Sequence, residues 1–148
     1  MKILVAYNCR SKASEKALDL AKMYSKAFDA FVHVVTSADS SKSEKDLPAK
    51  GEAENALWEA EQDLNKAGIS CKTHLLIRGL SPGEDIVKFA KDNDIDQIII
   101  GVEKKSRVGK FVMGSLAQYV ILKASCPVLT VKSSEVIPDV FLGSGSMA

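Results

Sequence analysis

Residues 98–120 combine residue types that can hold a phosphate group. Their apolar start, residues 98–101, is typical of a strand buried on both faces and ends on a glycine. A basic loop at 102–110 follows, and its net charge of +3 comes from four cations and one acid: Lys104, Lys105, Arg107 and Lys110 against Glu103. Gly114 and Ser115 then stand where a helix is expected to begin. Because the first N–H groups of a helix are unpaired and carry partial positive charge, this strand–loop–helix unit favours an anionic ligand.

The rest of the chain alternates short apolar runs with segments of helical periodicity. Strands are predicted at 2–7, 30–35, 70–77, 95–101 and 127–132, and helices at 14–28, 51–66, 81–92 and 115–123. Residues 37–50 are polar and without periodicity, and are interpreted as a surface loop or lid. This alternation predicts an α/β fold: a single three-layer domain with a doubly wound, five-stranded parallel sheet and helices on both faces.

Several of these strands end in residues that can contribute to one binding site. In doubly wound sheets, ligands bind beyond the carboxyl ends of the strands, where the winding direction reverses. Tyr7 and Asn8 follow the first strand, Val34 lies at the end of the second, and the basic loop follows the fourth. The sequence therefore predicts that these segments converge on one edge of the sheet.

Length and composition exclude several classes of protein. The 148 residues, 46% hydrophobic and 26% charged, are typical of one globular domain, and a net charge of +1 does not support a nucleic-acid-binding surface. No apolar run approaches the length of a membrane span, and residues 1–7 do not resemble a secretory signal. The three scattered cysteines (Cys9, Cys71 and Cys126) favour reduced thiols. We therefore expect a cytoplasmic protein that contacts neither membrane nor nucleic acid.

Four other conspicuous residues have structural interpretations as well as functional ones. His33 and His74 are expected to be structural and partly buried, since their spacing does not suit a metal site and no Cys or carboxylate cluster accompanies them. Ser115 either binds phosphate or acts as a helix N-cap, and no His or Asp is placed to activate it as a nucleophile. Trp58 is expected in the core or at an interface. No catalytic and no metal-binding residue is assigned.

With these motifs the chain resembles the universal stress proteins. The family's nucleotide motif is Gly, two residues, Gly, nine residues, Gly and then Ser or Thr, between the fourth strand and the fourth helix. Gly101 matches the first position and Gly114 with Ser115 the last two, whereas Lys104 stands at the second glycine. The opening residues 3–6 and the ending at 114–132 also resemble the family. The resemblance covers residues 2–132, which we take as the domain.

The resemblance implies a sheet of order 3-2-1-4-5, of the adenine nucleotide alpha hydrolase-like kind, and a homodimer paired through the last strand. Some family members bind ATP or AMP and others bind no nucleotide. An adenine nucleotide in this chain, with Mg²⁺ if it is ATP, is expected at eight residues: Tyr7, Asn8, Val34, Gly101, Lys104, Gly114, Ser115 and Leu116. Residues 133–148 form a C-terminal extension that either docks on a partner subunit or is a packed or loose tail, with a flexible end.

Two departures from the family pattern bear on the ligand. Asn8 stands where the family normally has Asp, and as it brings no charge, metal affinity is expected to be weaker. Lys104 keeps its backbone N–H and adds a cation, but disfavours the positive φ that glycine allows.

Two functions therefore stay open. The first is a dimeric, adenine nucleotide-binding stress-response or regulatory protein without efficient catalysis, with at most slow ATP hydrolysis. The alternative is a dimeric interaction module of the same family that binds no nucleotide. A third class is an enzyme on the same fold, such as an adenylating ligase. It is not supported, because this chain lacks the Ser-Gly-Gly-x-Asp-Ser phosphate loop that such ligases have after the first strand.

Overall fold

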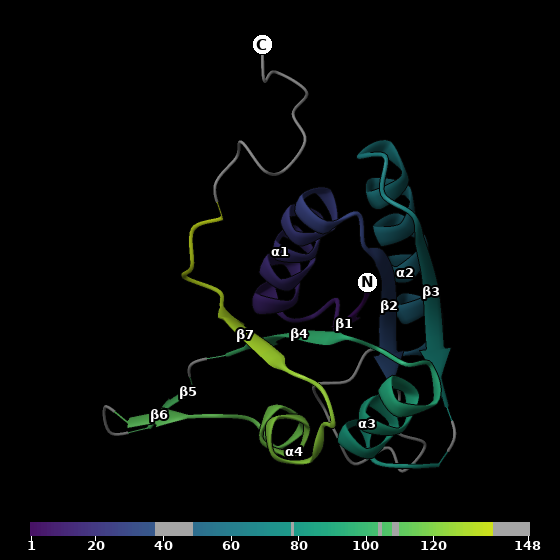
Figure 1. Ribbon diagram of the computed structural model, residues 1–148. Helices are drawn as coiled ribbons and strands as arrows, with labels where there is room; N and C mark the ends of the chain where they lie inside the picture. The colour runs from purple at the N-terminus through teal and green to yellow at the C-terminus, as the bar shows by residue number, and fades with distance from the viewer. Residues whose placement is uncertain (38–48, 78, 104, 108–109, 138–148) are drawn as a thin grey trace.

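A five-stranded, all-parallel sheet forms the middle layer of the computed structural model, which describes residues 1–37, 49–77, 79–103, 105–107 and 110–137 (Figure 1). Its order is β3-β2-β1-β4-β7, with the bounds β1 (Lys2–Ala6), β2 (Phe31–Ser37), β3 (Cys71–Leu76), β4 (Gln97–Val102) and β7 (Val128–Lys132). Counted along this sheet alone, the order is 3-2-1-4-5. The predicted fold class is therefore confirmed, and the winding direction reverses between β1 and β4.

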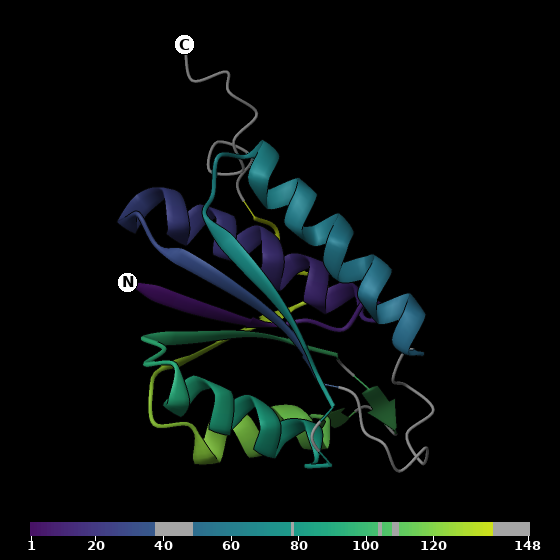
Figure 2. The ribbon, with the colours of Figure 1, turned by 90° about the vertical axis from the view of Figure 1, so that its right-hand side faces the viewer.

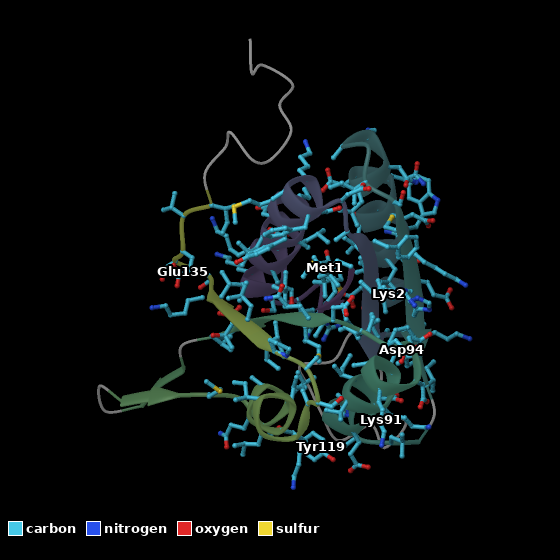
Figure 3. The ribbon with its side chains drawn as sticks, in the orientation of Figure 1. Met1, Lys2, Lys91, Asp94, Tyr119 and Glu135 are labelled. Atoms are coloured by element: carbon cyan, nitrogen blue, oxygen red, sulfur yellow. The ribbon has the colours of Figure 1, made fainter. Side chains whose placement is uncertain are left out.

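Four helices cover the two faces of the sheet. They are α1 (Lys12–Phe28), α2 (Lys50–Lys66), α3 (Pro82–Asp92) and α4 (Ser115–Lys123). Helices α1 and α2 lie on one face and α3 and α4 on the other, as both ribbon views show (Figures 1 and 2). Gly83 brings α3 close to α4, since a Cβ there would lie 2.9 Å from the Cβ of Tyr119, which is labelled in Figure 3.

The core is divided into two layers by the sheet, and the strands are buried on both sides. Along β1, Ile3 and Val5 belong to the layer under α1 and α2, while Leu4 and Ala6 belong to the layer under α3 and α4. This explains why the central strands are continuous apolar runs instead of alternating ones.

The segment predicted as a basic loop is partly a β-hairpin, so this prediction was wrong in part. Strands β5 (Lys105–Arg107) and β6 (Lys110–Val112) pair antiparallel and form a separate two-stranded sheet. The hairpin projects from the body of the domain in Figure 1. Three-residue strands rich in charge carry no apolar alternation, and for this reason periodicity did not reveal them.

The other predicted segments agree with the structure to different degrees. Most of the predicted loop at 37–50 and most of the extension at 133–148 lie outside the described residues. Ile137, within the described part of the extension, packs against the core layer under α1 and α2. Trp58 is 60% exposed on α2, which contradicts a place in the core. Across the described residues, every helix is too short or too polar to span a bilayer.

Candidate functional site

The carboxyl edge of the sheet brings the ends of β1, β2 and β4 together. Ala6, the last residue of β1, pairs with both Val35 and Ile100. Tyr7 extends this pairing, because its N–H donates to the carbonyl oxygen of Val35 at 2.9 Å and its own carbonyl accepts from the Thr36 hydroxyl at 2.8 Å. The predicted convergence of the first, second and fourth strands is therefore present in the structure.

Asn8 lies in a tight turn that uses its side chain. Its amide oxygen Oδ1 accepts the N–H of Arg10 at 3.0 Å, its own N–H donates to the Ser14 hydroxyl at 3.0 Å, and its carbonyl accepts from the N–H of Ser11 at 2.9 Å. Such an Asx turn is a common use of Asn at the start of a loop. The side-chain oxygen of Asn8 is therefore already bonded to the backbone of its own loop.

An ion pair ties this loop to the start of α2. Arg10 donates from Nε to Glu52 Oε1 at 3.2 Å and from Nη2 to Glu52 Oε2 at 2.8 Å. The hydrogen bond from Arg10 holds the pKa of the Glu52 carboxyl below its usual value. Burial, with Glu52 as a second cause, raises the pKa of the nearby Cys9 thiol. Cys9 is therefore a protonated thiol near neutral pH, not a reactive nucleophile.

Glu103 caps helix α1 from the end of β4. Its Oε1 accepts from the Ser11 hydroxyl at 2.7 Å and from the backbone N–H of Ala13 at 3.0 Å. Ser11 is the N-cap residue, but its side chain makes no capping bond to its own helix. A carboxylate at a helix N-terminus is favourable because of the partial positive charge there. The N-terminus of α1 is thus filled by an anion that belongs to the chain itself.

Gly101 is required by packing between β4 and α1. A Cβ at this position would lie 2.4 Å from the backbone carbonyl carbon of Ala13 and 2.5 Å from its oxygen. No side chain fits at such distances, and the neighbouring atoms are backbone that cannot rotate away. The first glycine of the predicted motif therefore has a structural reason that is independent of any ligand.

Gly114 is different, because neither conformation nor space demands a glycine there. It is the N-cap of α4, with φ −63° and ψ 156°, and an added Cβ would meet no atom within 4 Å. The N-cap is therefore Gly114, whereas Ser115, one of whose predicted roles was N-cap, is the first helical residue. Among the described residues no side chain caps α4, and the first turn of this helix holds no acid. By contrast, the Ser81 hydroxyl caps α3 by accepting from the N–H of Glu84.

The topology places the N-terminus of α4 at the carboxyl edge. Helix α4 connects β4 to its parallel neighbour β7. It must therefore run against the strand direction and begin where β4 ends. The first N–H groups of α4, at Ser115 and Leu116, have no intrahelical partner by construction.

The remaining predicted site residues lie as follows. Val34 does not lie at the end of β2 as predicted, because the strand continues to Ser37. Its side chain is fully buried in the core layer under α1 and α2, and its backbone lies between Val5 and Thr73 within the sheet. Leu116 is half-buried against the opposite core layer. Tyr7 is half-buried, and burial raises the pKa of its phenol. Lys104 lies outside the described residues.

The two histidines, predicted to be structural and partly buried, contact each other. His33 Nδ1 and His74 Nε2 lie 3.0 Å apart on neighbouring strands, in contact with Phe89 of α3. Burial lowers the pKa of His33, and burial together with His33 and Lys72 lowers the pKa of His74 to about 4. Their places on the second and third predicted strands were the one signal that could have indicated this pair.

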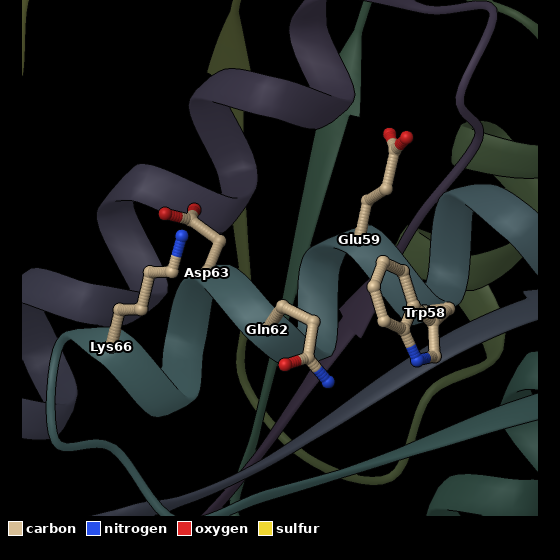
Figure 4. Close-up of a pocket in the computed structure, with 5 residues that line it drawn as sticks. All are labelled: Trp58, Glu59, Gln62, Asp63 and Lys66. Atoms are coloured by element: carbon tan, nitrogen blue, oxygen red, sulfur yellow. The ribbon is translucent and has the colours of Figure 1, made fainter.

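A shallow depression lies on the outer surface of α2, away from the loops of the sheet edge. It has a volume of about 310 Å³ and is lined by side chains of this helix alone: Trp58, Glu59, Gln62, Asp63 and Lys66 (Figure 4). Asp63 also pairs with Lys22 of α1. Because a single helix lines it, this depression lacks the converging groups of a ligand site. Within the described residues, no group of three or more His, Cys, Asp or Glu side chains is placed to hold a metal ion.

Comparison with protein families gives one match over most of the chain. The model of the universal stress protein family matches residues 1–132. A universal stress protein of Methanocaldococcus jannaschii is 32% identical over 132 residues, which cover 82% of this chain and 74% of the relative. Two other curated relatives are longer, and the matches span 42% and 49% of their length.

Solved structures show the same relationship. A universal stress protein from Archaeoglobus fulgidus has a TM-score of 0.78 and 36% identity, over 89% of this chain and 98% of that chain. A structure of the universal stress protein from Archaeoglobus fulgidus in complex with dAMP has a TM-score of 0.72 and 34% identity, again over 89% and 98%.

Proposed function

This chain belongs to the universal stress protein family, and from that premise we propose that it binds an adenine nucleotide at the carboxyl edge of its sheet. The observation that carries the proposal is the structure of a relative in complex with dAMP, which is 34% identical and covers 89% of this chain. In the cell, we propose a cytoplasmic stress-response or regulatory role without efficient catalysis.

The phosphate is proposed to bind at the first turn of α4. Support comes from the lack of a side-chain cap among the described residues, the absence of an acid in that turn, and the open space at Gly114. Three other helices begin near this edge: α1 is capped by Glu103, α3 is capped by Ser81, and α2 carries the acid Glu52 in its first turn. An anion therefore has least competition at the N–H groups of Ser115 and Leu116.

The adenosine part is proposed to lie against the ends of β1, β2 and β4. Tyr7, Asn8 and Gly101 line this edge, whereas Val34 lies further back, within β2. Lys104 is proposed to add a cation near the phosphate, and basic residues nearby favour an anionic ligand. The geometry of the described residues does not discriminate between AMP, dAMP and ATP, so binding of all three is tested.

No catalytic residue is part of the proposal. Ser115 lies at a helix start, and the two histidines that could activate a hydroxyl are paired with each other. If Mg²⁺ accompanies ATP, Asn8 offers it only a neutral oxygen that already accepts from Arg10. Hydrolysis, if any occurs, is therefore expected to be slow.

A homodimer through β7 is the second part of the proposal. β7 is a terminal strand of the main sheet, paired only with β4 among the described residues, so its outer edge can accept another strand. Leu122, just before β7, and Val136, just after it, are 77% and 87% exposed. Light scattering tests this directly: a mass of twice 16.0 kDa at micromolar concentration supports the dimer, and a mass of 16.0 kDa contradicts it.

The competing function is a dimeric interaction module without nucleotide. It is favoured by one observation, the use of Asn8 Oδ1 within its own turn. Isothermal titration with ATP, AMP and dAMP separates the two: saturable heat from any of them supports nucleotide binding, and no heat from all three supports the interaction module.

A further inference from the structure

The histidine pair lies on the sheet face under α3, on the two outermost strands at the β3 edge. In the parallel register, His33 of β2 is level with Lys72 of β3, and His74 is two residues further along β3. Both side chains therefore emerge on the same face, diagonally opposed. Their rings are 5.2 Å apart between centroids and inclined by 29°, with His33 Nδ1 and His74 Nε2 3.0 Å apart.

This separation suits two ligands of one metal ion. Imidazole nitrogens bind transition metals at about 2.0–2.1 Å, so two of them at an angle between 90° and the tetrahedral angle are about 2.9–3.4 Å apart. The two nitrogens share a hydrogen bond in this structure, and their separation of 3.0 Å lies within that range. A metal ion requires both of these nitrogens without a proton. Binding therefore breaks the hydrogen bond between the rings and transfers the proton of the donor nitrogen to the other nitrogen of the same ring, with no net release of protons.

The rings are held in place by aromatic neighbours. The ring of Phe31 is 4.9 Å from that of His33, and the ring of Phe89 is 5.7 Å from His33 and 4.6 Å from His74. Ligands that are already oriented lose less conformational freedom when a metal binds. Both histidines are only half-buried, so an ion and its water molecules can reach them from solvent.

We propose that His33 and His74 together chelate a divalent transition-metal ion at a site separate from the nucleotide edge. Imidazole is a good ligand for Cu²⁺, Ni²⁺ and Zn²⁺, and Cu²⁺ binds tightest in this series. Water completes the coordination. The charged neighbours that act on the two rings are cations, Lys2 (labelled in Figure 3) and Lys72, so the affinity is modest.

The test exploits the fact that the chain has only two histidines. Ni²⁺ is titrated into the untagged protein at neutral pH while the imidazole signals are followed by NMR. The proposal predicts that both histidines broaden together at substoichiometric Ni²⁺. If neither ring broadens, or only one does, the proposal is overturned. This measurement requires no variant.

Variants then identify the ligands by calorimetry with Ni²⁺. His33→Gln and His74→Gln are each expected to weaken binding about tenfold or more, since each leaves one imidazole. Lys72→Gln is expected to strengthen it severalfold, because it removes an opposing charge. A Cys9→Ser, Cys71→Ser and Cys126→Ser triple variant is expected to bind as the wild type does. Unchanged affinity in both histidine variants, or loss of binding in the cysteine variant, contradicts the proposal.

Discussion

The carboxylate of Glu103 accepts a hydrogen bond from the backbone N–H of Ala13 at 3.0 Å, across 90 positions of sequence. The residue that opposes the cations of the basic loop is therefore also the cap of α1. Through this bond the end of β4 is joined to the start of α1, and one of the helix N-termini near the sheet edge is filled. The N-terminus of α4, which no side chain of the described residues caps, remains the better place for an anionic ligand.

Removing this cap should destabilise the fold. We expect Glu103→Ala to lower the free energy of unfolding by about 1 kcal/mol, the usual cost of a lost helix cap. Glu103→Gln keeps an oxygen that can accept from the Ala13 N–H. Its free energy of unfolding should therefore lie between those of Glu103→Ala and the wild type. Urea unfolding of the three proteins measures this. Equal stability of Glu103→Ala and the wild type would show that the bond contributes nothing.

Replacing Gly101 of β4 and Gly51 of α2 with alanine should change the free energy of unfolding in opposite directions. Gly101→Ala brings a Cβ to 2.4 Å from the Ala13 backbone, and we expect a loss of about 1–3 kcal/mol or more, as for an overpacked core. Gly51→Ala is the matched control, since its Cβ meets nothing within 4 Å and it lies in a helix. It should be as stable as the wild type or up to about 1 kcal/mol more stable. Comparable losses in both variants would refute the packing argument.

Gly114→Asp should separate binding from stability. At an N-cap, Asp supplies the side-chain acceptor that α4 lacks, so we expect the melting temperature to be unchanged or slightly raised. The same carboxylate fills the first turn and repels a phosphate, so nucleotide binding should be lost. Gly114→Ala is the neutral control, with open space around its Cβ. Calorimetry and thermal unfolding on the three proteins measure both effects.

The histidine pair predicts a dependence of stability on pH when metal is removed with EDTA. The folded-state pKa of His33 is lowered and that of His74 is lowered to about 4, against an ordinary value of 6.5. The unfolded chain therefore binds more protons than the folded one below pH 6.5. The contribution of the pair is complete above about pH 6.5 and is lost progressively as the pH falls towards 4.

Urea unfolding between pH 4.5 and 7.5 measures this loss. We expect His74→Gln to show a shallower loss than the wild type between pH 6.5 and 4.5, because one of the two depressed groups is absent. Parallel curves for the two proteins across this window would contradict the prediction.

The strands and helices of the parallel sheet were predictable because they depend on local patterns, whereas the strand order 3-2-1-4-5 was expected from the family resemblance. Apolar runs such as residues 98–101, and the helical periodicity of α2, can be recognised from a few neighbouring residues. Right-handed crossovers between parallel strands then leave few possible topologies. Two contacts join residues far apart in the sequence: Glu103 caps Ala13 across 90 positions, and His33 contacts His74 across 41. The periodicity of a sequence does not indicate contacts of this kind. Trp58 lies on the exposed side of α2, whose buried residues are Ala53, Leu57, Ala60 and Leu64. Size alone therefore does not place an aromatic residue in the core.

Native mass spectrometry of the wild type and Gly114→Asp, each incubated with AMP, dAMP or ATP, tests the central claim most directly. Our account predicts that the wild type retains an adenine nucleotide and that Gly114→Asp, equally folded, retains none. A wild type that carries no nucleotide would contradict nucleotide binding. Equal occupancy of the two proteins would show that the phosphate does not lie at the first turn of α4.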